Sequence, residues 1–326
     1  MSVAFAIRIL TLLALGAAGL LPNTALAAEY PDRPVRWIVP YSAGGTTDVI
    51  ARNVAHAISQ MFGHAIVIDN RAGAGGRTAM AAVAKSDPDG YTLLVSDASL
   101  ATAPSLYAEL PFDPTKDLTP IAMFATVPHI VVVSPEVGVG SLGELIALAK
   151  KDPGKLNFGS GGIGSPLHLA GEVLRLETGM PWTHIPYKGA GPAIIASITN
   201  EVQVATPSLP AALAQLQAGK LRALAVMSPK RLAMLPDVPT AAELGFPKAT
   251  VQGWVGLHAP AGTPPAILGA IEAEIAKALQ SPELRERLTA QGADVAPEMG
   301  AAYGKLVANE TARWKQVVAA AGIPPQ

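Results

Sequence analysis

Three glycine-rich turns carry the residues of this chain that could bind a small anion. They are Ser42–Thr46, Gly73–Gly76 and Gly159–Gly164, and each stands between a predicted strand and a predicted helix. Such turns leave backbone N–H groups free, and the helix dipole adds partial positive charge, so each can hold a carboxylate or a phosphate. A single turn of this kind is often only a tight connection. Three of them at strand ends favour an anion site.

The turn Gly159–Gly164 also has the spacing G-x-G-x-x-G of a dinucleotide fingerprint. The signal is weak, because Gly138, Gly140 and Gly143 show the same spacing in another context. A dinucleotide site would also place an acidic residue at the end of the next strand, where this chain has His184–Pro186. A nucleotide cofactor is therefore not expected.

The sequence lacks most of the residues that a metal site or a catalytic nucleophile would require. There is no cysteine, which excludes thiolate nucleophiles and Cys-ligated metals. His168 has no second histidine at a metal-ligand spacing, and no G-x-S-x-G string surrounds Ser42, Ser160 or Ser165. We predict neither a metal nor a cofactor, and an exported hydrolase stays as an alternative. Asp48, in the first turn of the first helix, could face a ligand's ammonium or hydroxyl group, or could simply neutralise the helix N-terminus.

The elements that must position these turns alternate between short apolar segments and helical ones, which is typical of an α/β fold with mainly parallel sheets. The predicted strands are 35–40, 66–69, 92–96, 130–133, 156–158, 184–185, 202–205, 222–226 and 253–259. The predicted helices are about 46–61, 78–85, 142–150, 165–177, 192–199, 265–280, 282–291 and 299–321.

The 326 residues exceed one typical domain, and the order of elements predicts two lobes. A new unit begins after Pro128, and the strand 253–259 returns the chain to the first unit. We expect lobe 1 to comprise residues 28–128 and 252–326, and lobe 2 to comprise residues 129–251.

The first residues have the pattern of a secretory signal peptide. Arg8 precedes the apolar run Ile9–Leu21, and Ala25–Ala27 supplies the small-x-small pattern of a cleavage site after Ala27. The run is shorter than the roughly 20 residues of a membrane span.

Without Arg8 the chain has 23 basic and 25 acidic residues, a net charge of −2, and no basic stripe, so nucleic acid is not an expected partner.

Several strings together resemble the substrate-binding subunit of tripartite tricarboxylate transporters, the Bug family of periplasmic binding proteins, over essentially the whole mature chain. Each string is unspecific, but their order and spacing are specific. They are Pro40, Tyr41, Ala43–Gly45 and Asp48; Asn70 and Gly73–Gly76; Phe158–Ser160, Gly164, Ser165, His168 and Leu169; His184, Pro186–Gly189 and Pro192; Leu235–Thr240; and Ala259–Pro264.

The resemblance implies a type II periplasmic-binding fold that closes on a small carboxylate and delivers it to the transporter's membrane subunits. In that family the loop after the first strand and the glycine-rich loop of the second lobe hold the carboxylate through backbone amides and ordered waters. Carried over, with Ser208 at a position that differs from many relatives, the expected binding residues are Tyr41, Ser42, Ala43, Gly44, Gly45, Thr46, Asp48, Ser160, Gly161, Gly164, Ser165 and Ser208.

Two departures from relatives affect the far end of the ligand. This chain has Thr206–Ser208 where many relatives carry an acidic residue, and Val255 where relatives often place an aromatic. Dicarboxylates, tricarboxylates, amino acids and aromatic acids all remain open as ligands. By the same resemblance we expect a monomer in the periplasm, and signalling to a sensor kinase stands as an alternative to transport.

Overall fold

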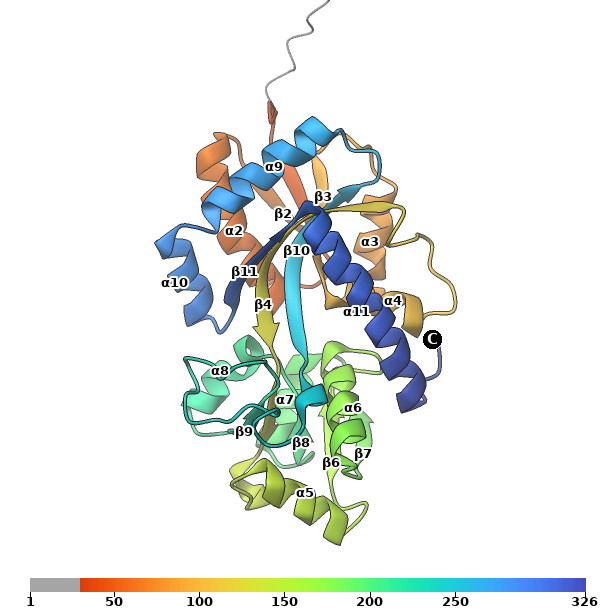
Figure 1. The fold of residues 1–326 in the computed structure, drawn as a ribbon, viewed down its shortest axis with the longest axis vertical. Coiled ribbons are helices and arrows are strands. Elements are labelled where there is room, and N and C mark those ends of the chain that lie inside the picture. The colour runs from red at the N-terminus through yellow and green to blue at the C-terminus, as the bar shows by residue number, and fades with distance from the viewer. Residues whose placement is uncertain (1–29) are drawn as a thin grey trace, which may run out of the picture. The chain divides into compact units, whose positions relative to one another are not determined.

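The computed structural model describes residues 30–326, so the predicted signal peptide and its cleavage site lie outside the described residues. The unit Arg33–Gln326 contains two sheets (Figure 1). The six-stranded sheet has the order β11-β4-β10-β3-β1-β2. Its strands are β1 (Val35–Val39), β2 (Ile66–Asn70), β3 (Thr92–Asp97), β4 (Leu118–Pro128), β10 (Gln252–Pro260) and β11 (Asp294–Met299).

Six α-helices belong to the same half of the unit as this sheet. They are α2 (Thr46–Phe62), α3 (Arg77–Ala84), α4 (Ala98–Leu106), α9 (Pro265–Ala278), α10 (Pro282–Ala290) and α11 (Gly300–Ala321). Helix α2 shows why they form: Ile50, Val54 and Ile58 recur every four residues and are fully buried, which makes one apolar face. The helix ends at Gly63, whose φ of 67° favours glycine.

The five-stranded sheet has the order β7-β6-β8-β5-β9 and lies in the lower half of Figure 1. Its strands are β5 (Ile130–Val133), β6 (Asn157–Ser160), β7 (Thr183–Pro186), β8 (Val204–Ala205) and β9 (Arg222–Val226). Its helices are α5 (Leu142–Lys151), α6 (Pro166–Thr178), α7 (Ala190–Ile198) and α8 (Leu209–Gln217). Short 3₁₀ turns, η1 (Ala74–Gly76), η2 (Pro135–Val137) and η3 (Pro247–Ala249), complete the described elements.

Both sheets are mixed, so the expectation of mainly parallel sheets needs correction. In the first sheet β1 pairs in parallel with β2 and β3, whereas β10 is antiparallel to β3 and β4, and β11 is antiparallel to β4. In the second sheet β6 is parallel to β7 and β8, and β5 is antiparallel to β8 and β9. The crossover helices fix only the parallel pairs. The antiparallel pairs come from β4, β5 and β10, which carry the chain between the two sheets.

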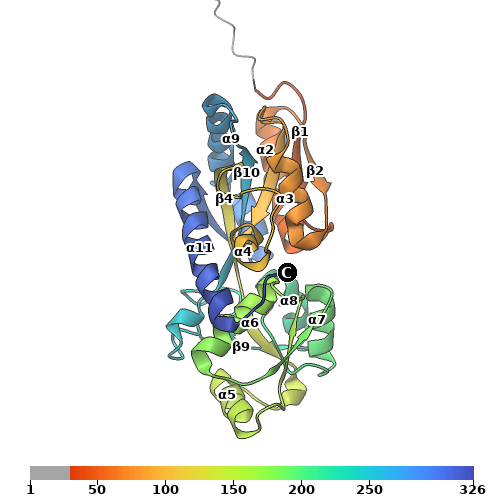
Figure 2. The same cartoon turned by 90° about the vertical axis from the view of Figure 1, so that its right-hand side faces the viewer.

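The connections between the sheets position the cleft. Strands β4 and β10 pair along their length in antiparallel directions, so that β4 runs toward the second sheet and β10 returns from it (Figure 1). Helix α11 also reaches from the first sheet to α6, as the side view shows (Figure 2). The strands of the first sheet fall in 35–128 and 252–299, and those of the second fall in 130–226. The lobe boundaries after Pro128 and before Gln252 stay a prediction, because Arg33–Gln326 clusters as one unit.

Among the strands and α-helices of the described residues, four have no counterpart among the predicted ones: β4, α4, α8 and β11. Pro120 and Pro128 lie within β4, and Pro104 lies inside α4, so these segments looked like loops. Among the described residues, no helix is both long and apolar enough to cross a bilayer.

Candidate functional site

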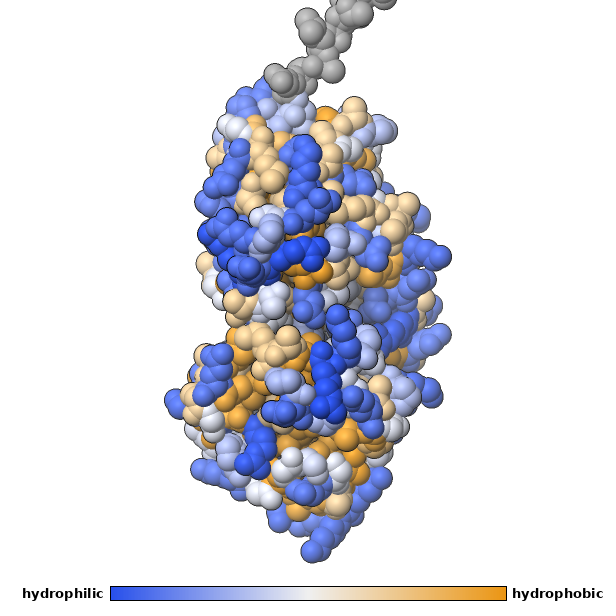
Figure 3. Space-filling model, turned by 60° about the vertical axis from the view of Figure 1, so that its left-hand side comes forward, coloured by the Kyte–Doolittle hydropathy of each residue, from blue (hydrophilic) through white to orange (hydrophobic). Residues whose placement is uncertain are grey.

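A cavity of about 470 Å³ lies between the two sheets, with walls from both halves of the unit. It begins where β1, β3 and β6 end, since Tyr41, Asp97 and Gly161 line it. In an α/β sheet the carboxyl ends of the strands are where ligands bind. The molecular surface is hollowed at the level between the two halves (Figure 3).

Five helices of the described part of the chain have their N-termini at this cavity: α2, α4, α6, α7 and α8. Their first residues or N-caps, which are Thr46, Asp97, Ser165, Gly189 and Ser208, all line it. The first N–H groups of a helix have no acceptor within the helix, and the macrodipole adds about half a positive charge there. None of the described lining residues is Lys or Arg. Any attraction of the cavity for an anion therefore comes from backbone groups and not from a cationic side chain.

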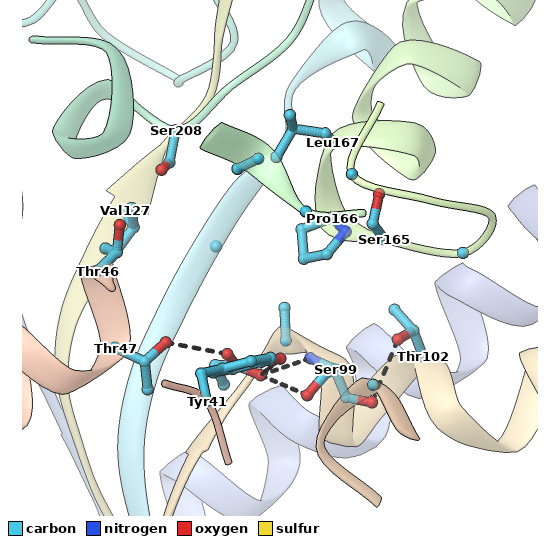
Figure 4. Close-up of a pocket in the computed structure, with 18 of the residues that line it drawn as sticks. Tyr41, Thr46, Thr47, Ser99, Thr102, Val127, Ser165, Pro166, Leu167 and Ser208 are labelled. Carbon is cyan, nitrogen blue, oxygen red and sulfur yellow. Dashed lines mark hydrogen bonds between the residues drawn. The ribbon is translucent and has the colours of Figure 1, made fainter. Parts of the chain in front are cut away.

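Half of the twelve predicted binding residues line the cavity. Side chains of the two halves face one another across it, with Tyr41 and Thr47 on one side and Ser165 and Ser208 on the other (Figure 4). The predicted residues that line it are Tyr41, Thr46, Gly161, Gly164, Ser165 and Ser208, and those outside the lining are Ser42, Ala43, Gly44, Gly45, Asp48 and Ser160.

Asp48 holds the first loop in shape instead of lining the cavity. Its Oδ2 accepts hydrogen bonds from the N–H of Gly44 at 2.8 Å and from Nε of Arg52 at 2.9 Å, and its Oδ1 accepts one from Nδ2 of Asn70 at 2.9 Å. Burial raises the pKa of Asp48, but these three bonds outweigh it and leave the pKa below its usual value. Asp48 therefore bonds to the loop, to Arg52 and to Asn70, and it does not line the cavity.

Ser160 is fully buried beneath the second loop. Its Oγ accepts the N–H of Gly162 at 3.1 Å and lies 2.6 Å from Nε2 of His184. His168 stacks on His184 with 4.0 Å between ring centroids, and its Nδ1 accepts the N–H of Gly164 at 3.0 Å. These two histidines thus fix the backbone of the loop that lines the cavity.

The pair Ser160–His184 has the spacing of a nucleophile and its base, but not the access that a hydrolase needs. The serine is 0% exposed and does not line the cavity between the sheets. Its hydroxyl is already engaged with both the N–H and the carbonyl of Gly162. The geometry therefore supports a structural role for this pair.

Asp97 is the charged residue at the cavity that the sequence analysis missed. It caps α4 and is 9% exposed. Its Oδ1 accepts the hydroxyl of Tyr41 at 3.2 Å and the N–H of Ser99 at 3.0 Å, and its Oδ2 accepts the hydroxyl of Thr47 at 3.1 Å. Burial raises the pKa of Asp97, although the bonds from Ser99 and Thr47 lower it in part. Its position directly after a predicted strand was the signal that could have found it.

His129 and Trp254 complete the wall where the chain passes between the sheets. Nδ1 of His129 lies 2.8 Å from the carbonyl oxygen of Thr206, and burial lowers the pKa of this histidine. The indole N–H of Trp254 is buried and has no acceptor among the described residues. No cluster of three or more metal-ligating side chains occurs in residues 30–326.

Comparison with known proteins assigns this arrangement to a family. Residues 50–323 match the model of the tripartite tricarboxylate transporter family receptor. The chain belongs to this receptor family. It is also 40% identical over 298 residues to protein BugT of Bordetella pertussis, and the match covers 91% of each chain. The resemblance inferred from the sequence motifs is confirmed.

Solved members show the same fold. An R. palustris protein solved with adipate has a TM-score of 0.85 and 35% identity, and the match covers 91% of this chain and 100% of that one. MatC from Rhodopseudomonas palustris with bound malate has a TM-score of 0.79 and 33% identity, covering 89% and 100%. The periplasmic binding protein BugD has a TM-score of 0.82 and 33% identity, covering 91% and 100%. The expected periplasmic-binding fold is thereby confirmed.

The receptor's buried histidines make its stability depend on pH. Burial lowers the pKa of His258 to about 3 and that of His168 to about 4, from an ordinary 6.5. Between these values and pH 6.5 the unfolded chain binds more protons than the folded one. The stabilisation that depends on keeping these two histidines neutral is therefore fully present above pH 6.5 and is lost as the pH falls. We expect the free energy of unfolding to be lower at pH 5.0 than at pH 7.5 by about 2 kcal/mol from His258 alone.

Guanidinium unfolding at the two pH values measures this difference. A His258→Gln variant should lose about that part of the pH dependence, because glutamine does not titrate. An unfolding free energy that is equal at both pH values, or a dependence unchanged in the variant, would show that His258 is not held neutral by the fold.

Proposed function

We propose that the chain is a periplasmic receptor that binds a small carboxylate in the cavity between its sheets and delivers it to the membrane subunits of a tripartite transporter. The observation that carries the proposal is that five helix N-termini meet at this cavity, while none of its described lining residues is Lys or Arg. Backbone N–H groups bind a carboxylate through its oxygens. Two solved relatives carry adipate and malate, which agrees with this chemistry.

We further propose that the ligand closes the cleft. Ser165 and Ser208 come from the half that holds the second sheet, and Tyr41 and Thr46 come from the other. A carboxylate that contacts both halves only when they are close together binds the closed form more tightly and shifts the equilibrium toward it. No covalent step is needed, and none of the twelve predicted site residues has a catalytic role in this proposal.

The proposed location and lobe boundaries follow from the same account. We propose that the leader is removed after Ala27 and that residues 129–251 move as one lobe against 28–128 and 252–326. N-terminal sequencing of the exported protein checks the cleavage site.

Delivery to membrane subunits is supported by the family's description, and loss of carboxylate uptake on deletion of the gene would test it.

A thermal-shift screen of the exported protein against organic acids, amino acids and sugars tests the binding proposal. A ligand at 100 times its dissociation constant adds about 2.7 kcal/mol to stability, so a carboxylate should raise the melting temperature by several degrees. Stabilisation by sugars or metal cations alone would contradict the proposal.

A further inference from the structure

The carboxylate of Asp97 gives the cavity a negative charge for which no cation is provided. Asp48, the other buried aspartate near the cavity, pairs with Arg52 at 2.9 Å. Asp97 instead receives only hydroxyl and amide hydrogens, from Tyr41, Thr47 and Ser99. No Lys or Arg lies among the described lining residues. The charge therefore faces a cavity that has backbone dipoles but no counter-ion.

Capping of α4 does not by itself require this charge. The N–H of Ser99 could be accepted equally well by the oxygen of Asn, Ser or Thr at the cap position. The hydrogen bonds are also uneven, because three donors reach Oδ1 and only the hydroxyl of Thr47 reaches Oδ2. A carboxylate oxygen can accept two hydrogen bonds, so Oδ2 retains room for a donor from a ligand.

His129 adds a second acceptor to the same wall. A carbonyl oxygen only accepts hydrogen bonds, so the contact with Thr206 places the ring proton on Nδ1. The neutral ring then has an unprotonated Nε2, which makes no hydrogen bond to another described residue. The residue is 3% exposed and lines the cavity. Asp97 and His129 are thus two acceptors at the cavity wall, and a ligand that pairs with them must supply hydrogen-bond donors.

The rest of the wall is largely apolar. Leu106, Val127, Leu167 and Trp254 line the cavity, and hydrocarbon groups of a ligand would be removed from water against them. The helix N-termini of the second half, at Ser165 and Gly189, supply a site for one carboxylate. The cavity thus combines one anion site, one anionic side chain and an apolar surface.

We propose that the ligand is a zwitterionic α-amino acid with an apolar side chain, whose ammonium group binds Asp97 while its carboxylate binds the helix N-termini. This inference rests on the proposed function, and it narrows the ligand class. A dicarboxylate would bring a second negative charge into a cavity that already holds one. The receptor therefore discriminates against dicarboxylates such as the adipate and malate bound to two of its solved relatives.

Isothermal titration calorimetry of the exported protein tests the inference without any mutation. The probes are the apolar α-amino acids, the same acids without their amino group, and succinate, malate and adipate. We expect at least one amino acid to bind about 10-fold or more tighter than its deaminated counterpart and than every dicarboxylate, as expected for a charge-assisted hydrogen bond. If deaminated acids or dicarboxylates bind as tightly as the amino acids, the inference is wrong while the proposed function stands.

An Asp97→Asn variant then assigns the preference to this side chain. Asparagine can still cap α4 but carries no charge, so the ratio between the amino acid and its deaminated form should fall to near one. Asp113→Asn is a matched control: Asp113 Oδ1 accepts the N–H and hydroxyl of Thr115 two residues on, as Asp97 does with Ser99, but it does not line the cavity. If the affinity ratio between the amino acid and its deaminated form is unchanged in Asp97→Asn, the assignment to Asp97 is wrong. If no carboxylate binds the original protein, the proposed function is wrong as well.

Discussion

A Gly161→Val variant should lose ligand binding by more than about 100-fold, or about 2.7 kcal/mol, while remaining folded. A Cβ at this position would lie 3.2 Å from the backbone nitrogen of Ala190 and 3.2 Å from the carbonyl carbon of Gly189. Both partners are backbone atoms at the start of α7, so they move only if the loop and the helix separate. Gly161, Gly189 and Ala190 all line the cavity, and valine would both fill it and displace its walls.

Gly191→Val provides the matched control for this measurement. Gly191 lies at the start of α7, next to Ala190, but a Cβ there meets no atom within 4 Å, and the residue does not line the cavity. Calorimetric titration of both variants with the ligand found by thermal shift should show loss of binding in the first and an almost unchanged affinity in the second. Equal affinities in the two variants would mean that the ligand does not reach the second loop.

A Gly171→Ala variant should destabilise the fold by about 3 kcal/mol, at the upper end of the usual cost of overpacking. Gly171 lies in α6, where an added Cβ would fall 2.1 to 2.7 Å from three atoms of the Phe158 ring. That ring is fully buried and stacks on Trp182 with 4.7 Å between centroids. It cannot turn away, so the helix and strand β6 must move apart.

Gly143→Ala separates this clash from the general effect of alanine in a helix. Gly143 lies in α5, and its added Cβ would have only the hydroxyl of Ser141 nearby, at 3.9 Å. Alanine should stabilise that helix by about 0.5 to 1 kcal/mol. Chemical unfolding of the two variants should therefore give changes of opposite sign, and a Gly171→Ala protein as stable as the original would contradict the packing described for α6.

Most of the elements could be predicted from the sequence, because apolar periodicity and turn residues mark them locally. Helix α2 was predicted to within a residue or two, since Ile50, Val54 and Ile58 recur at helical spacing. Helix α4 was missed for the opposite reason. It follows β3 without an intervening turn and contains Pro104, so neither its start nor its interior shows an ordinary helix signal.

The binding loops could be predicted, but the individual contacts could not. Glycine and threonine at a strand end indicate a turn that exposes backbone N–H groups, which is why Gly161 and Thr46 were identified. Whether Asp48 faces the cavity or the loop depends on Asn70, which a neighbouring strand brings within 2.9 Å. Asp97 was missed because no glycine-rich turn follows the predicted strand 92–96, and its partner Tyr41 lies 56 residues away in sequence. Such long-range pairs leave no local pattern.

The central claim is that a small carboxylate binds in the cavity between the two sheets, and calorimetric titration of carboxylates into the original protein and the Gly161→Val variant tests it most directly. We predict one site per chain in the original protein and none in the variant, with both proteins folded to the same extent. A carboxylate that binds both proteins with equal affinity would place the site elsewhere on the molecule and contradict the account.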